Sequence, residues 1–216
     1  MRNTTLIVAL LLTLAWSSPR AAAVADADLL DVYVSIRTYD ITGLTAADRQ
    51  NTLAVASNIL RAAGLEVDWM ECEGVFVRSA GDPCLAPLGP TDLAVRFVRL
   101  PPPPGRDGTL PLGYSLVDTR TRSGSLATMY VDRVAGLAVT CGIDLGRLLG
   151  RAVAHEIGHL LLGTRDHANT GLMRALWSRE AIRGSADGKW LFSPREARGM
   201  RDAVRTRTVQ QLAIRN

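Results

Sequence analysis

The chain has 216 residues and a formal net charge of +4, enough length for one domain with a substantial core. Its excess of basic over acidic residues is too small to indicate nucleic-acid binding. Residues 1–25 contain two arginines and no acidic residue, so the rest of the chain has 23 basic and 21 acidic residues. Lys189 is the only lysine, so we attribute the arginine content to a compositional habit rather than to a binding function.

Residues 1–25 have the pattern of a secretory signal peptide. Arg2 supplies a positive start, residues 6–16 form an apolar segment, and small residues at 21–25 offer a cleavage site. The apolar segment is too short for a comfortable membrane span, so we expect no stable membrane anchor. We therefore expect a secreted or periplasmic protein whose single domain covers residues 26–216.

The domain is predicted to open with a strand followed by a helix. Residues 32–37 alternate between apolar and polar side chains, as in a strand with one buried face. Thr45 and Asp48 have the spacing of a capping box, and the helix that they start is expected to end at Gly64. Its apolar stripe consists of Leu53, Ala56, Ile59 and Leu60.

Further strands are predicted at 65–70, 93–98, 113–117 and 126–131. A loop rich in proline and glycine, residues 101–112, separates the second from the third of them. No internal repeat or second domain is visible. The elements therefore predict an α+β domain.

Three cysteines indicate one disulfide. Cys72 and Cys84 flank a short polar loop, and in an oxidising compartment they are the obvious pair. Such a bridge would stabilise the fold by roughly 2–3 kcal/mol on the chain-entropy model. Cys141 is left over, and we expect it to be a buried free thiol.

A C-terminal helix is predicted from Ser193. Ser193 and Glu196 form its capping box, with a proline at the first helical position. Arg198, Arg201 and Arg205 share one face of this helix. We interpret that face as solvated, and contact with an anionic lipid or polymer is the alternative.

All three histidines lie within residues 155–167, which is the most informative feature of the chain. His155 and His159 are four residues apart, so on a helix both imidazoles project from one face and can hold one metal ion. Glu156 lies between them in the pattern H-E-x-x-H, where a glutamate beside the metal can take a proton from metal-bound water. A site that only binds metal would not need this glutamate.

A pattern of only three fixed residues also arises by chance, for example as an exposed helix patch. The surroundings argue against chance, because residues 145–160 predict a helix with a broad apolar face and the histidines lie at its edge. Zn²⁺ is the expected ion, since a catalytic zinc has three protein ligands and one water.

Two histidines leave one protein ligand to be found. His167 is the leading candidate, because Gly163 can end the helix in a left-handed conformation and let the chain bring His167 back beneath the ion. The alternatives are Asp166 and Glu180. The clustering of histidines favours His167.

The run resembles the metzincin clan of zinc metallopeptidases, whose signature is H-E-x-x-H-x-x-G-x-x-H followed by a turn that contains methionine. Here the spacing is H-E-x-x-H-x-x-x-G-x-x-x-H. The resemblance implies that Met173, six residues after His167, is the methionine of this Met-turn and forms the floor beneath the metal; an ordinary core methionine is the alternative. Position 175 is alanine, so no tyrosine ligand is expected.

The resemblance also implies a mixed, twisted sheet with a backing helix, an active-site helix, the Met-turn and a C-terminal helix. Residues 113–117 would be the antiparallel edge strand that holds an extended peptide. We therefore expect a monomeric, secreted zinc metalloendopeptidase that acts on a protein or peptide, with Glu156 as general base. The alternatives are a zinc-binding module of the same fold without hydrolysis, and a zincin with an acidic third ligand.

Overall fold

The computed structural model describes residues 32–72, 81–100, 110–184 and 187–215, all within one compact unit. The predicted signal peptide, residues 1–25, lies outside the described residues. Within them, no helix is long and apolar enough to cross a membrane.

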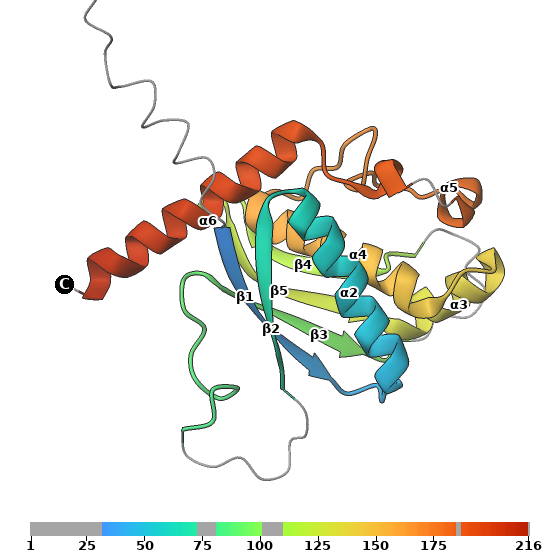
Figure 1. Ribbon diagram of the computed structural model, residues 1–216, viewed down its shortest axis with the longest axis horizontal. Coiled ribbons are helices and arrows are strands. Elements are labelled where there is room, and N and C mark those ends of the chain that lie inside the picture. The colour runs from blue at the N-terminus through green and yellow to red at the C-terminus, as the bar shows by residue number, and fades with distance from the viewer. Residues whose placement is uncertain (1–31, 73–80, 101–109, 185–186, 216) are drawn as a thin grey trace, which may run out of the picture. The chain divides into compact units, whose positions relative to one another are not determined.

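A mixed five-stranded sheet forms the centre of the fold (Figure 1). Its strands are β1 (Val32–Asp40), β2 (Leu65–Glu71), β3 (Asp92–Val98), β4 (Gly113–Asp118) and β5 (Ser123–Tyr130). Their order is β2-β1-β3-β5-β4, and only β4 runs antiparallel to its neighbour, β5. The expectation of a mixed sheet with an antiparallel edge strand at 113–117 is confirmed.

Two long helices pack against one face of this sheet. The helices are α2 (Ala46–Ala62), α3 (Val131–Cys141), α4 (Leu145–Leu162), α5 (Arg179–Arg183) and α6 (Pro194–Arg215), with a 3-10 turn, η1, at Asp187–Trp190. Helix α2 packs against β2, α4 packs against β4 and β5, and the two helices contact each other. Helix α6 crosses α4 and contacts β1 (Figure 1).

The inward-facing residues of β1 belong to the core, and two glycines set how closely α4 packs against α2. Val32, Val34 and Ile36 point into the core and are buried, as predicted. On α4, a Cβ at Gly146 would lie 2.8 Å from the carbonyl oxygen of Asp48, and one at Gly150 would lie 2.6 Å from that of Thr52. Both glycines therefore let α4 lie directly against the backbone of α2.

Both predicted N-caps are confirmed, but only Ser193 and Glu196 form the full capping box, because the Asp48 carboxylate accepts from the Thr45 hydroxyl and not from the Thr45 backbone N–H. Thr45 accepts a hydrogen bond from the backbone N–H of Asp48 at 3.0 Å, and its hydroxyl donates to the Asp48 carboxylate at 2.7 Å. At the start of α6, the carboxylate of Glu196 accepts from the N–H of Ser193 at 2.7 Å, and the Ser193 hydroxyl accepts from the N–H of Glu196 at 3.3 Å. Each cap satisfies N–H groups that the first helical turn leaves unpaired.

Helix α3 is the main departure from the predicted elements. The strand expected at 126–131 is β5, which ends at Tyr130, and Val131 already begins α3. The buried residues Val131, Val134, Ala138 and Cys141 have helical spacing, and Gly142 ends the helix with φ +63°. The predicted strand is confirmed except for its last residue, whereas α3 was not predicted, because Val131 extends the apolar pattern of the strand although it begins the helix.

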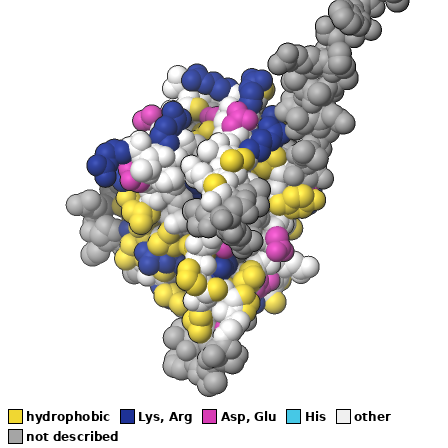
Figure 2. Space-filling view, turned by 90° about the vertical axis from the view of Figure 1, so that its left-hand side faces the viewer, with side chains coloured by type: hydrophobic (Ala, Val, Ile, Leu, Met, Phe, Trp, Pro, Cys, Tyr) yellow, Lys and Arg dark blue, Asp and Glu magenta, His cyan; other side chains and the backbone are white. Residues whose placement is uncertain are grey.

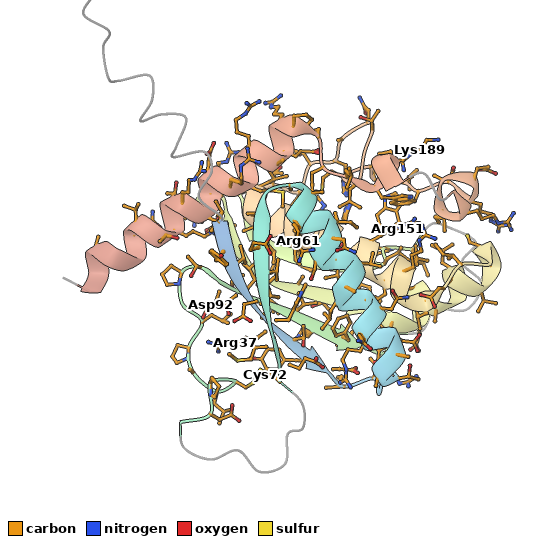
Figure 3. All side chains as sticks on the ribbon, viewed as in Figure 1. Arg37, Arg61, Cys72, Asp92, Arg151 and Lys189 are labelled. Carbon is orange, nitrogen blue, oxygen red and sulfur yellow. A yellow bond between two sulfur atoms is a disulfide. The ribbon has the colours of Figure 1, made fainter. Side chains whose placement is uncertain are left out.

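The predicted disulfide joins Cys72 to Cys84, with their Cα atoms 5.6 Å apart. It ties the end of β2 to a loop that β1 also holds, because the Tyr39 hydroxyl donates to the carbonyl oxygen of Cys84 at 3.0 Å. Arg37 and Asp92 form an ion pair at 3.2 Å beside this loop (Figure 3). Cys141 is free and buried, as expected.

Removing the disulfide by replacing Cys72 and Cys84 with alanine should lower the free energy of unfolding by about 2–3 kcal/mol, since an open loop gains entropy in the unfolded chain. Urea unfolding of this variant and of the parent, each with and without a reductant, checks the value. An unfolding midpoint of the parent that does not respond to the reductant would contradict it.

Of the three arginines that were expected to share a solvated face of α6, Arg201 is the one that departs from this expectation. Arg201 donates to the carbonyl oxygen of Ala63 at 2.7 Å and so caps the end of α2. Arg198 is exposed, and Arg205 pairs with Asp202 at 3.5 Å. On the face of the molecule in Figure 2, basic and acidic side chains are interspersed.

Candidate metal centre

Helix α4 carries the two histidines through the middle of the fold. The Asp144 carboxylate starts it by accepting from the N–H of Arg147 at 2.8 Å, and Gly163 ends it with φ +62°. A Cβ at Gly163 would lie 2.2 Å from the carbonyl oxygen of Arg122, so only glycine fits there. Residues 148–161 are all buried, whereas the sequence predicted a single apolar face. The sheet, α2, α3 and α6 enclose the helix together.

The imidazoles of His155 and His159 are oriented by backbone carbonyls. Nδ1 of His155 lies 2.9 Å from the carbonyl oxygen of Leu172, and Nδ1 of His159 lies 2.9 Å from that of Thr164. Because a carbonyl oxygen only accepts, each Nδ1 must carry the proton. In the neutral rings, both Nε2 atoms therefore present lone pairs, which is the usual arrangement of histidine ligands to a metal.

The chain after Gly163 brings His167 to the same point. Its Nε2 lies 3.3 Å from Nε2 of His159, which in turn lies 3.1 Å from Nε2 of His155. The segment is closed by a hydrogen bond from the N–H of Ala168 to the carbonyl oxygen of Met173 at 2.8 Å. This bond holds His167 against the turn at residues 171–173.

Neither acidic alternative joins this group. Asp166 accepts from the Thr164 hydroxyl at 2.9 Å and is exposed. Glu180 is exposed in the first turn of α5, beside the cap residue Ser178. Within the described residues, the cluster that could hold a metal ion is His155, His159 and His167, whose ligand atoms all lie within 4.8 Å of one another.

The donor set of this cluster suits a cation. Lone pairs on the Nε2 atoms of His155 and His159 face each other at 3.1 Å, and no proton lies between them in the neutral state. Burial lowers the pKa of His155 to about 4 and also lowers the pKa of His159, so both rings are neutral at pH 7. Two nitrogens on one tetrahedral zinc would lie about 3.4 Å apart, close to the spacing here. The three residues therefore fit a zinc ion.

Glu156 follows His155 directly on α4, and its side chain is buried against β4. Its carboxylate accepts from the Ser115 hydroxyl at 2.6 Å. Burial raises the pKa of Glu156 to about 7, and the hydrogen bond from Ser115 opposes this shift. A carboxyl group with such a pKa can both take up and release a proton near neutral pH.

Gly113 leaves the space that the Glu156 side chain occupies. A Cβ at this position would lie 2.9 Å from both Cγ and Oε1 of Glu156. Gly113, Ser115 and Val117 are the inward-facing residues of β4, so the strand presents a glycine and a hydroxyl to the glutamate.

Met173 packs directly against the histidine helix. It is buried, and a Cβ at Gly158 would lie 2.7 Å from its Sδ and 2.6 Å from the Phe192 ring. Gly171 allows the preceding turn with φ +73°. The turn at residues 171–173 therefore lies against α4 beside His159, and its Leu172 carbonyl orients His155.

Two tryptophan rings, Trp177 and Trp190, pack in sequence against the imidazole of His155. The Trp177 ring meets the His155 ring edge-on, with centroids 5.6 Å apart, and meets the Trp190 ring in the same way at 4.9 Å. The guanidinium of Arg151, a buried residue of α4 that Figure 3 labels, lies 4.0 Å from the Trp190 centroid. These contacts fix Trp177 beside the histidines.

The three histidines and Glu156 open into a cleft of about 900 Å³. One wall is residues 110–115, which include the start of edge strand β4. Residues of α3, Arg165 and the segment 174–179 line the rest of the cleft. Because the outer edge of β4 has no strand partner among the described residues, its backbone N–H and C=O groups can pair with an extended peptide.

Sequence reasoning missed three contributors to the site: Gly113, Ser115 and Trp177. Ser115 could have been found, because it is a polar residue at an inward-facing position of an alternating strand. Trp177 carried no such signal, since its segment has no regular period. The carbonyls of Thr164 and Leu172 act through the backbone and leave no mark on residue type.

No family model and no curated protein matches this chain. A solved structure of similar fold is that of a "zinc-dependent peptidase from Methanocorpusculum labreanum (strain Z)". The two chains are 13% identical, the TM-score is 0.48, and the match covers 76% of this chain and 99% of the other.

The raised pKa of Glu156 predicts a pH-dependent effect of Glu156→Gln on the metal-free protein. The Glu156 carboxyl has a higher pKa in the folded state than in the unfolded chain, so its protonated form stabilises the folded state. This contribution is fully present below the unfolded pKa of 4.5 and is lost as the pH rises through the folded pKa of about 7. Glutamine does not titrate, and the histidine contributions cancel between variant and parent. The stability of the variant relative to the parent should therefore increase from pH 4.5 to pH 8, on the order of 2–3 kcal/mol. Urea unfolding at both pH values, with chelator present, measures it; a constant difference would contradict the buried carboxyl.

Proposed function

We propose that this protein is a secreted, zinc-dependent endopeptidase of the metzincin type. The observation that carries the proposal is the convergence of three histidine Nε2 atoms next to a buried glutamate, at the end of a cleft that runs along an open strand edge. Such a set combines a metal site, a proton acceptor and a place for an extended peptide.

His155, His159 and His167 would hold the zinc, with Met173 beneath them. A zinc ion bound here would polarise the scissile carbonyl and acidify a water molecule. The carbonyls of Leu172 and Thr164 keep the imidazoles of His155 and His159 in the tautomer that binds metal.

Glu156 would be the general base. It would take a proton from the attacking water and pass it to the amine that leaves when the peptide bond breaks. Burial raises the pKa of Glu156 in the metal-free site, and a zinc ion beside it would lower that pKa again, so the carboxylate would be ionised and able to accept the proton. Ser115 and Gly113 keep the carboxylate in place.

Secretion is supported by the signal-peptide pattern of residues 1–25 and by the disulfide between Cys72 and Cys84, which forms in oxidising compartments. We propose that the protein acts as a monomer on a protein or peptide in the periplasm or outside the cell, without binding nucleic acid.

The test is cleavage of a broad peptide library by the purified protein. We expect cleavage that a zinc chelator abolishes and that added zinc restores, because the three histidines would bind the zinc ion on which the reaction depends. A folded, zinc-loaded protein that cleaves no peptide would contradict the proposal and would leave a zinc-binding module without hydrolysis.

A further inference from the structure

The cleft beside the metal centre is rich in arginine. Its lining includes two acidic residues, Asp132 and Glu156, and four arginines, which are Arg133, Arg165, Arg174 and Arg179. Both acids are already engaged. Asp132 pairs at 3.3 Å with Arg99, which is not a lining residue, and Glu156 accepts from Ser115. The net charge on the wall of the cleft is therefore positive.

Arg133 and Arg165 are held by the backbone rather than by carboxylates. Arg133 donates to the carbonyl oxygen of Pro111 at 3.0 Å and stacks 4.5 Å from the Tyr130 centroid. Arg165 donates to the carbonyl oxygen of Val117 at 3.1 Å. Among the described residues, no carboxylate lies within ion-pair distance of either guanidinium. Each keeps its full charge and further donors for another acceptor.

These two contacts place the guanidiniums at opposite ends of the edge strand. Pro111 lies just before β4, beyond a bend at Leu112, and Val117 is the second-last residue of β4, so the strand's open edge at 113–116 lies between the two contacts. At about 3.4 Å per residue, the strand from Gly113 to Val117 covers roughly 14 Å. A peptide lying along β4 would meet one guanidinium near each end.

We propose that Arg133 and Arg165 select peptides with carboxylate side chains on both sides of the scissile bond. This rests on the proposed function, because it names the substrate class of the same site. Guanidinium groups fixed at the rim of a cleft pair well with carboxylates. Because the formal net charge of the whole chain is only +4, we attribute the preference for acidic peptides to these two arginines and not to the overall charge.

A purely structural role for the two arginines makes a different prediction. If Arg133 and Arg165 only fix the ends of β4, their loss would weaken the binding of acidic, neutral and basic peptides alike. If they select the substrate, their loss would weaken the binding of acidic peptides alone. Peptides of one sequence with Glu, Gln or Lys at the flanking positions separate the two roles.

The experiment measures binding of these labelled peptides to the zinc-loaded Glu156→Gln variant by fluorescence anisotropy. In this background, Arg133→Gln and Arg165→Gln are compared with Arg198→Gln, a matched change at an exposed position of α6. We expect the Glu peptide to bind about fivefold more tightly than the Gln peptide, and each cleft variant to remove about half of this preference on a logarithmic scale. Roughly 0.5 M salt should reduce the preference, and Arg198→Gln should not.

Charge reversal gives the sharpest outcome. Arg165→Glu should favour a Lys peptide over a Glu peptide at the position that Arg165 contacts. Equal binding of Glu and Gln peptides, or a uniform loss in both cleft variants, would overturn the proposal. Cleavage by the parent is measured separately. Cleavage without a charge preference would overturn only the proposed selectivity for acidic peptides. A charge preference in binding without any cleavage by the parent would overturn only the proposed peptidase function.

Discussion

Replacing Glu156 with glutamine is expected to reduce peptide hydrolysis by at least about 10²- to 10⁴-fold, the range typical of a general base. Glutamine keeps the size of the side chain and can still accept from the Ser115 hydroxyl, but it cannot take a proton. The loss should fall on kcat, because Glu156 acts on the reacting water and not on the docking of the peptide.

The control for this variant is its metal content. Glu156 is not among the residues that converge as ligands, so Glu156→Gln should bind zinc with the parent's stoichiometry and unfold cooperatively. If the glutamine variant cleaves peptides as fast as the parent, Glu156 is not the base and the mechanism proposed here is wrong.

Replacing His167 with alanine is expected to weaken zinc binding by at least about 100-fold, because it removes one of three protein ligands. Asp166→Ala and Glu180→Ala are the matched comparisons, since both residues are exposed and neither joins the histidine cluster. Competition with a chromogenic chelator gives the three affinities. Both acidic variants should stay within a few-fold of the parent.

The opposite pattern would identify a different third ligand. If His167→Ala keeps the parent's affinity while Asp166→Ala or Glu180→Ala loses it, the segment after Gly163 must rearrange when zinc binds. The proposal of a metzincin-type site would then be wrong, although His155 and His159 on α4 would remain candidate ligands.

The local parts of the fold could be predicted because their signals are local. Caps at Thr45 and Ser193, the alternation at residues 32–37 and the left-handed end of α4 at Gly163 each depend on a few neighbouring residues. The disulfide was predicted for the same reason, since its cysteines flank one short loop.

The parts that depend on tertiary packing could not be predicted. The complete burial of α4 results from layers contributed by distant elements, and the capping of α2 by Arg201 joins residues 138 positions apart. The start of α3 at Val131 was missed because strand and helix share one apolar run, which has no period of its own at the boundary.

The candidate site divides in the same way. Residue type identified His155, Glu156 and His159, because their spacing on one helix already brings them together. The backbone partners of the imidazoles and the hydroxyl of Ser115 reach the site from other elements, so only the folded chain reveals them.

Whether three histidines hold a zinc ion can be measured by X-ray absorption at the zinc edge of the purified protein. We expect one zinc per chain with three imidazole nitrogens at about 2.0–2.1 Å and one further light ligand. A spectrum with sulfur or only two imidazoles in the ligand set, or a folded protein that takes up no zinc, would contradict it.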